Sequence, residues 1–377
     1  MARTIVDIHV IQTVPPSNIN RDDTGSPKTA VYGGRRRARV SSQAWKRATR
    51  NAFEDLLNPI ELGVRTKRVV ELLSEEITRQ DDSLTPRAGE LAEATLTAAG
   101  ITLVAARKKE APKESQFLLF LSARQIESLA ELAITAAQTD GTLTIDKASA
   151  RARADTDHSV DVALFGRMVA NATDLNVDAA CQVAHALSVH AVDTEYDYFT
   201  AVDDHKNNDQ EEDAGAGMIG TVEFNSSTLY RYATIDVDRL HENLGDDTAT
   251  TRAVEAFTHA FVSSMPTGKQ NTFANRTLPD AVLIVVRQTQ SINLVGAFEE
   301  AIEDNAEGGR IVTAIAHLAD HARELHTAFD EQPVAAWVFG VGDKRIAPLA
   351  ELAQRTTFDP AVTSLGALIS ERLGQPR

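Results

Sequence analysis

Apolar and polar residues alternate most clearly near the start of the chain and in its C-terminal half. Within residues 4–14, Val6, Ile8 and Val10 fall on one face, as in a β-strand that packs on a core. Strands are predicted at residues 4–14, 37–40, 159–169, 221–236, 281–288 and 334–339. Helices are predicted at residues 43–57, 178–190, 251–264, 312–329 and 360–373. Ser41 and Ser42 are suitable caps for the first of these helices.

Three long excursions separate these elements. Residues 15–34 are rich in Pro, Asn, Asp and Gly and predict a long loop. Residues 63–153 have a helical, polar-faced pattern, which predicts a helical lobe inserted into the fold. Residues 203–217 are acidic and almost free of apolar side chains, so they predict a mobile projecting loop. Strands separated by helices and excursions indicate an α+β fold, with a ferredoxin-like or RRM-like core as our first choice.

Length and composition narrow the class of protein. The 377 residues are 43% hydrophobic, which is enough for a large core. No run of about 18 apolar residues occurs, so no spanning helix and no membrane partner are expected. The first residues lack the sections of a secretory signal. With Cys181 as the one cysteine no internal disulfide can form, and a cytoplasmic location is expected.

The charge of the chain is unevenly distributed. Its net charge of −16 by itself argues against a nucleic-acid partner. Residues 24–53 nevertheless contain no Asp or Glu. The cationic residues of this stretch are Lys28, Arg35, Arg36, Arg37, Arg39, Lys46, Arg47 and Arg50. One concentrated basic surface on an acidic body fits a protein that binds a phosphate backbone in one groove and repels it elsewhere.

The predicted helix from Ser42 separates its apolar and cationic residues. At about 100° per residue, one sector gathers apolar side chains and the opposite sector gathers polar ones. The apolar sector contains Trp45, Ala48, Ala52 and Leu56, and the polar sector contains Gln43, Lys46, Arg47 and Arg50. The helix N-terminus adds free backbone N–H groups that favour a phosphate oxygen. A solvated amphipathic helix has the same pattern, but the acid-free flanks favour RNA binding.

Acidic residues and histidines support a second hypothesis, a metal-dependent nuclease. Asp22 and Asp23 are adjacent carboxylates that could hold Mg²⁺, although Arg21 beside them also fits an internal ion pair. The other candidate ligands are Asp161, Asp193, Asp203, Asp204, His158, His185, His190 and His205. Their spacing matches no zinc pattern, and the histidines five residues apart on the predicted helix point about 140° apart. Structural histidines are therefore the better interpretation, and no metal site is expected.

Two further segments have features of a base-stacking surface. Met168 follows Gly166 and Arg167 at the end of a predicted strand, where a flexible side chain could wedge between bases. Residues 230–232 (Tyr-Arg-Tyr) place a cation between aromatic rings, as base-stacking surfaces do. Both patterns are also common in packed cores, so neither decides the function alone.

Taken in order, several segments resemble the guide-RNA-binding backbone subunit of the type I-E CRISPR Cascade complex. The segments that carry the resemblance are NRDD (20–23), KTAVYGGRRRARVSSQAWKRATR (28–50), VDVALFGRM (160–168), AHALSVHAVDTEYDYFTAVDD (184–204), GTVEFNSSTLYRYATI (220–235) and GKQNTF (268–273). The resemblance covers most of residues 1–290, and its basic block is the most specific part.

The resemblance implies an RRM-like palm with an inserted helical fingers lobe and a projecting thumb loop. The implied division is palm at 1–60, fingers at 61–154, palm at 155–195, thumb at 196–221 and palm at 222–377. Residues implied to bind RNA are Arg21, Lys28, Ser41, Gln43, Lys46, Arg50, Met168 and Lys269. Met168 would stack near a displaced base. Arg107, Lys108 and Lys109 form a cationic tip on the fingers lobe that could contact target DNA.

The implied role is non-catalytic. Copies of the subunit would stack in a helical hexameric filament along the CRISPR guide RNA, together with other Cascade subunits, and present the guide in segments for pairing with target DNA. Backbone contacts suit this role because they fix register without reading sequence. No cofactor is expected. A third hypothesis, a generic α+β domain whose basic helix binds an acidic protein, predicts a weak salt dependence and no competition by RNA.

Overall fold

The computed structural model describes residues 3–108, 111–138, 144–169, 173–201, 218–304 and 308–375. A ten-stranded sheet forms its centre, in the order β14-β13-β12-β1-β11-β9-β3-β2, with β8 and β10 also paired to β11. The strands of this sheet are β1 (Ile5–Ser17), β2 (Thr29–Tyr32), β3 (Arg35–Val40), β8 (Cys181–Val183), β9 (Ala186–Ser188), β10 (Glu195–Ala201), β11 (Met218–Asp236), β12 (Ala281–Arg287), β13 (Ala335–Gly340) and β14 (Gln354–Arg355). The described strands pair antiparallel except β13 with β14, so the fold is α+β, as predicted.

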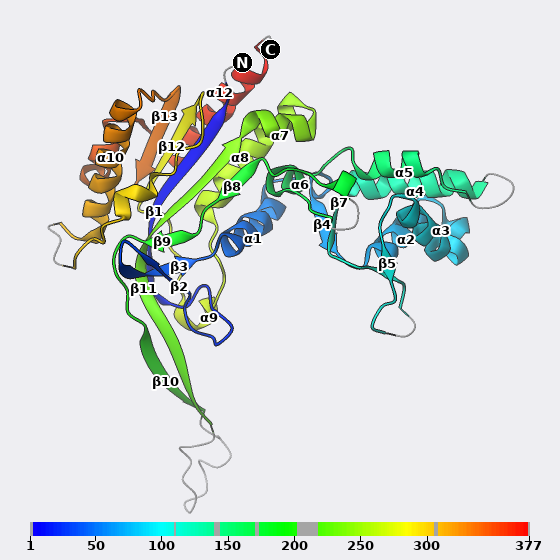
Figure 1. The fold of residues 1–377 in the computed structure, drawn as a ribbon, viewed down its shortest axis with the longest axis horizontal. Coiled ribbons are helices and arrows are strands. Elements are labelled where there is room, and N and C mark those ends of the chain that lie inside the picture. The colour runs from blue at the N-terminus through cyan, green and yellow to red at the C-terminus, as the bar shows by residue number, and fades with distance from the viewer. Residues whose placement is uncertain are drawn as a thin grey trace, which may run out of the picture.

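Helices cover both faces of this sheet (Figure 1). One face carries α1 (Ser42–Ala52), α6 (Val160–Phe165), α7 (Val237–Leu244), α8 (Asp247–Ser263) and α12 (Phe358–Leu373), and the other carries α10 (Arg310–Ala328) and α11 (Asp343–Ala350). The short α9 (Gln270–Phe273) lies near β1. As predicted, Val6, Ile8 and Val10 of β1 share one core with α1 and α8, whereas Ile11 packs beneath α10. Each such side chain contributes about 1.5–3 kcal/mol when fully buried.

An inserted lobe extends to one side of the sheet (Figure 1). It contains β4 (Gly63–Thr66), α2 (Val69–Gln80), α3 (Ala88–Ala98), β5 (Leu103–Val104), β6 (Glu114–Ser115), β7 (Leu119–Ser122), α4 (Ala123–Gln138) and α5 (Lys147–Ala154). The lobe has a hydrophobic core of its own, built mainly from α2, α3 and α4. The predicted helical excursion is thus confirmed, with the addition of two small two-stranded sheets.

A second excursion is the hairpin of β10 and β11, which projects from the end of the sheet (Figure 1). It exposes Tyr196 and Tyr198, two aromatic side chains on β10. The predicted acidic loop at 203–217 lies outside the described residues. Within the predicted loop at 15–34, β1 continues to Ser17 and Thr29–Tyr32 form β2, so residues 18–28 and the turn at 33–34 lie outside the strands.

Two predicted elements were wrong. Within residues 159–169, Val160–Phe165 form the helix α6 rather than a strand; it follows Ser159 and is capped by Gly166, which has a φ of 78°. Their apparent alternation reflects burial on every side, since residues 160–164 are all buried. Residues 178–190 form β8 and β9 rather than a helix, because β11 supplies backbone partners to both. Tertiary pairing therefore overrides the local helical pattern.

Candidate nucleic-acid interface

Helix α1 docks on the sheet through a cation and aromatic rings. Trp45 is fully buried, and the guanidinium of Arg231 lies 3.7 Å from the centre of its ring. Arg231 also donates to the Gln12 side chain and to the Phe261 carbonyl. Burial lowers the pKa of Arg231 to about 9, and the adjacent rings contribute cation–π stabilisation to the buried guanidinium. This contact fixes α1 against the sheet and determines which of its side chains face solvent.

The exposed face of α1 carries the predicted polar side chains. Gln43 and Arg47 are exposed, and Lys46 is half-buried with its ammonium 6.0 Å from the centre of the Phe165 ring. On the docked face, Thr49 is buried together with Trp45, whereas the predicted Ala48 is only half-buried. The division of the helix into a docked and a solvent face is therefore confirmed, with this shift in the buried set.

The N-terminus of α1 is joined to a loop that precedes it in sequence. Ser41 is buried and caps the helix, accepting from the Ala44 N–H at 3.3 Å. Its own backbone N–H donates to the Asn20 side chain at 2.8 Å. The backbone N–H of Lys28 donates to the Asn20 carbonyl at 3.0 Å. These bonds hold Arg21 and Lys28 close to the start of the helix.

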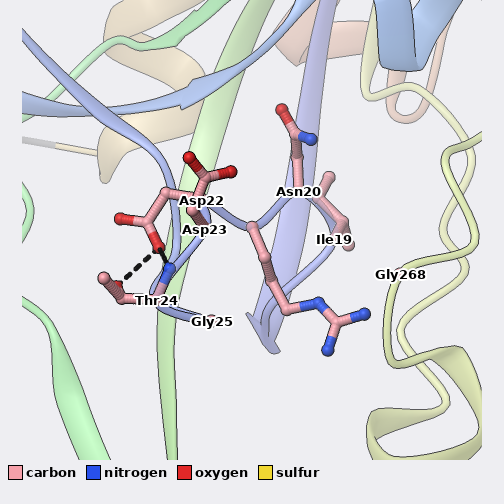
Figure 2. Close-up of a pocket in the computed structure, with 8 residues that line it drawn as sticks. Ile19, Asn20, Asp22, Asp23, Thr24, Gly25 and Gly268 are labelled. Atoms are coloured by element: carbon pink, nitrogen blue, oxygen red, sulfur yellow. Dashed lines mark hydrogen bonds between the residues drawn. The ribbon is translucent and has the colours of Figure 1, made fainter.

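A third segment completes this surface. Gly268 approaches so closely that a Cβ there would lie 2.4 Å from the Ile19 carbonyl oxygen. Figure 2 shows Gly268 beside Ile19 and Asn20, with which it lines an open hollow of about 520 Å³ that also includes Arg21. Lys269 follows directly, with a left-handed backbone at φ 52°. The structure thus brings together Arg21, Lys28, Ser41 and Lys269 from separate segments.

The carboxylate of Asp22 accepts hydrogen bonds from neighbouring residues of this loop. Its Oδ1 accepts from the Thr24 backbone N–H at 2.9 Å and the Thr24 hydroxyl at 2.7 Å (Figure 2). It also accepts from the Ser26 N–H at 3.0 Å. These bonds lower the pKa of Asp22, beginning with the one from the Thr24 hydroxyl. Two other carboxylates of the nuclease hypothesis, at positions 203 and 204, lie outside the described residues. In the parts of the chain that the structure describes, no three potential ligands gather around a metal position.

The two histidines near β9 do not share a helix: His185 lies in the turn between β8 and β9, and His190 follows the end of β9. His190 is buried and satisfied: its Nδ1 lies 2.7 Å from the Ala191 carbonyl and its Nε2 accepts from the Thr228 N–H at 3.1 Å. His185 is exposed. His158, in turn, lies 3.0 Å from the Gln125 amide in a separate region. The structural interpretation therefore holds for His190 and His158.

Most cations of the basic block have no acidic partner. Elsewhere, arginines such as Arg79 and Arg323 form ion pairs with neighbouring Glu and Asp side chains. Within the described residues, no acidic side chain forms a salt bridge with Arg21, Lys28, Arg35, Arg36, Arg39, Lys46, Arg47 or Lys269. These residues lie on α1, on β3, on the loop bonded to both, or, for Lys269, directly after Gly268, which contacts that loop. We call these cations without acidic partners the cationic surface of this acidic protein.

Two arginines of the basic block are used structurally instead. Arg37 is fully buried, and its guanidinium donates to the carbonyls of Ser188 at 2.9 Å and of Phe298 and Glu299 at 3.0 Å. Arg50 forms an ion pair of 2.9 Å with Asp161, whose side chain is 2% exposed. The sequence grouped these two side chains with the exposed cations because their partners lie far away in the chain.

Arg50 connects α1 to the base of the inserted lobe. Besides Asp161 it donates to the Gly63 carbonyl at 3.0 Å, and its guanidinium lies 4.5 Å from the centre of the Phe120 ring. Asp161 in turn accepts from the Gly63 N–H at 3.0 Å. The side chain of Arg50 is 32% exposed, so a contact with RNA at this position stays a prediction.

Met168 is 83% exposed, which is unusual for methionine. The residues on either side hold its backbone. Arg167 is buried and donates to the carbonyls of Leu175 at 2.7 Å and Phe120 at 3.3 Å and to Asp155 at 3.1 Å. The Val169 N–H donates to the Asn176 side chain at 2.6 Å. Met168 is therefore presented to solvent on a fixed segment, which is compatible with the predicted wedge.

Residues 230–232 do not form a base-stacking surface. Tyr230, Arg231 and Tyr232 are all buried, and the Tyr232 hydroxyl donates to Asp7 at 2.8 Å. The projecting hairpin instead exposes three aromatic side chains, Tyr196, Tyr198 and Phe199. The alternating aromatic pattern of residues 196–199 in the sequence was the available signal for them.

The cationic tip of the inserted lobe is partly described. Arg107 and Lys108 are exposed and line an open hollow of about 570 Å³ together with Arg68 and Lys113. Lys109 lies outside the described residues. No salt bridge joins Arg107 or Lys108 to an acidic side chain within the described chain.

Comparisons with known proteins agree with this fold over nearly its whole length. No curated protein sequence has significant similarity to the chain. A solved structure described as "CRISPR RNA-guided surveillance complex, pre-nicking" contains a similar chain, with 36% identity, a TM-score of 0.83, and 97% of this chain and 100% of that chain covered. Another, described as "CRISPR RNA-guided surveillance complex", has 30% identity and a TM-score of 0.71, covering 97% of this chain and 99% of the other. No helix among the described residues is long and apolar enough to cross a membrane. The family model of CT1975-like proteins matches residues 6–364, and the chain belongs to this family.

Proposed function

We propose that this chain is a guide-RNA-binding backbone subunit of a type I-E CRISPR surveillance complex, and that it has no catalytic activity of its own. The observation that carries the proposal is the unneutralised cationic surface around α1, on a protein whose net charge is −16. Such a surface favours a polyanion, and it would bind the RNA backbone without reading sequence. The similar chains in RNA-guided surveillance complexes support the same role.

The arrangement of the sheet supports an RRM-like palm. The βαββαβ order of ferredoxin-like domains is found in β1, α1, β8, β11, α8 and β12, taken along the chain. The lobe is inserted after α1, and shorter elements such as β2, β3 and α6 lie between the six. Strand β1 lies between β11 and β12 at the centre of the sheet. In this proposal the inserted lobe is the fingers, and the hairpin of β10 and β11 belongs to the thumb.

The exposed Met168 supports a further part of the proposal. A polarizable side chain held on a fixed segment can stack against a base that the neighbouring thumb displaces. Copies of the subunit would then divide the guide into short segments for pairing with target DNA, in a helical hexamer with other Cascade subunits. Arg107 and Lys108, with Lys109, would contact the target DNA, and replacing all three by alanine should lower the affinity for target DNA.

The test is co-purification of the tagged chain from cells that also express the partner subunits and a guide RNA. The expected result is a large particle containing RNA of uniform length that is protected at regular intervals. A monomer free of nucleic acid would contradict the proposal. The particle should leave RNA and DNA intact during incubation with Mg²⁺ or Mn²⁺, and cleavage that EDTA stops would instead support a nuclease.

A charge-reversal pair tests the cationic surface itself. Lys46→Glu with Arg47→Glu should abolish RNA binding while the protein stays folded, since neither side chain has an acidic partner among the described residues. The matched control is Lys344→Glu with Arg345→Glu, two exposed cations on α11. This control makes the same change in net charge on the opposite face of the sheet. Equal loss of binding in both pairs would show that total charge, rather than this surface, determines affinity.

A further inference from the structure

His185 lies within the cationic surface, at the turn between β8 and β9. Its Nδ1 is 3.3 Å from an Nη1 of Arg39, on β3. Because β9 pairs with β3 in a fixed register, Arg39 opposite Leu187 and Val40 opposite Ala186, this turn is held beside Arg39. The side chain of His185 is exposed.

The contact with Arg39 determines which ring nitrogen of His185 carries the proton. A guanidinium only donates hydrogen bonds, so the Nδ1 of His185 must accept and the proton of the neutral ring lies on Nε2. Partial burial, followed by the charges of Arg39 and Lys28, lowers the pKa of His185. The ring is therefore neutral near pH 7 and has one free N–H donor.

Two neighbouring cations complete a set of donors. Arg39 uses its Nε on the Thr29 carbonyl at 3.2 Å and one Nη on His185. Its second Nη has no hydrogen bond within the described residues. Lys28 is joined to Arg39 through the backbone, where the Arg39 N–H donates to the Lys28 carbonyl at 2.9 Å. Arg39 and His185 therefore offer one cationic and one neutral donor at the same place, and the charge of Lys28 acts on the same ring.

We propose that His185, Arg39 and Lys28 form a binding site for one phosphate group of an RNA backbone, with His185 donating through Nε2–H as a neutral ligand. This inference rests on the proposed function, since it assigns a site within the same RNA-binding surface. A phosphate oxygen is the ligand that matches this set, because it accepts several hydrogen bonds and is attracted by both cations. The order of the chain explains why the site is not visible in the sequence: His185 follows Arg39 by 146 positions.

The test measures binding of the full-length chain to a fluorescently labelled single-stranded RNA of about 30 nucleotides at pH 7.5, over a series of salt concentrations. His185→Ala should weaken binding by about tenfold to 150-fold, the effect of losing a hydrogen bond to a charged group. It should leave the slope of log affinity against log salt unchanged, because a neutral donor releases no counterion. Arg39→Gln should weaken binding and also reduce that slope by about 0.7, the contribution of one neutralised phosphate.

Two controls separate a binding role from a structural one. His317→Ala removes an exposed histidine on α10 and should leave affinity unchanged. His185→Gln retains an amide donor near the position of Nε2 and should bind within about twofold of the native protein. His185→Ala binding as tightly as the native protein would overturn the site, and a reduced salt slope in His185→Ala would overturn the neutral donor. Failure of the native chain to bind RNA at all would instead refute the proposed function.

Discussion

Replacing Arg50 by alanine tests whether the ion pair between α1 and Asp161 is structural. Arg50→Ala leaves Asp161 with a 2% exposed carboxylate that has lost its cationic partner. It also removes the hydrogen bond to the Gly63 carbonyl and the contact with the Phe120 ring. Breaking a fully buried ion pair costs about 3–5 kcal/mol. Because Arg50 is itself 32% exposed, we expect a smaller loss of about 2–3 kcal/mol in the free energy of unfolding.

The assay is urea unfolding monitored by tryptophan fluorescence, since Trp45 is the residue of α1 that is buried against the sheet and reports on the docking of that helix. The matched control is Arg47→Ala on the same helix, which is exposed and should change the free energy of unfolding by less than about 0.5 kcal/mol. Equal stability of the two variants would refute the reasoning, because it would show that the pair with Asp161 contributes nothing.

This prediction affects how RNA binding is tested. From the sequence alone, a double variant with Lys46→Glu and Arg50→Glu is predicted to abolish RNA binding without unfolding the chain. In the structure, a glutamate at position 50 would place a second carboxylate against the buried Asp161. We therefore expect this double variant to lose stability as well as affinity, whereas Lys46→Glu with Arg47→Glu should lose affinity alone.

Three further predictions concern the supporting structure. Gly33→Ala should destabilise the protein by about 1–3 kcal/mol more than Gly34→Ala in thermal or urea unfolding. Both glycines have positive φ, but only at Gly33 would a Cβ meet a backbone carbonyl oxygen, at 1.7 Å. Equal losses of stability in the two variants would contradict this clash. Burial lowers the pKa of His9 to about 3 in the folded state. The unfolded chain therefore binds the proton first, and the free energy of unfolding should fall by about 1.4 kcal/mol for each pH unit below about 6.5. His9→Gln should reduce that slope, and an unchanged slope would refute the assignment. Met168→Ala should change the free energy of unfolding by less than about 0.5 kcal/mol, because the side chain is exposed. The same variant should reduce the fluorescence of 2-aminopurine placed at displaced positions of a bound guide. Loss of stability would show that Met168 packs in the protein.

The sequence alone determined the elements with strong periodicity. Strand β1 and helix α1 were predicted from their own residues, because alternation and helical spacing depend only on which neighbouring side chains are apolar. The absence of Asp and Glu from residues 24–53 likewise marked the cationic surface. For the same reason the inserted lobe was expected, since its helical pattern is continuous within one stretch of chain.

The tertiary structure decided which of those cations face solvent. Arg37 and Arg39 are two positions apart in one basic run, yet one is buried against carbonyls and the other joins His185 on the surface. Residues 178–190 became strands because β11 supplies their hydrogen-bond partners, and Met168 is exposed because Arg167 anchors the segment to the lobe. Burial, pairing and exposure depend on groups that are distant in sequence, so no local pattern of residues can determine them.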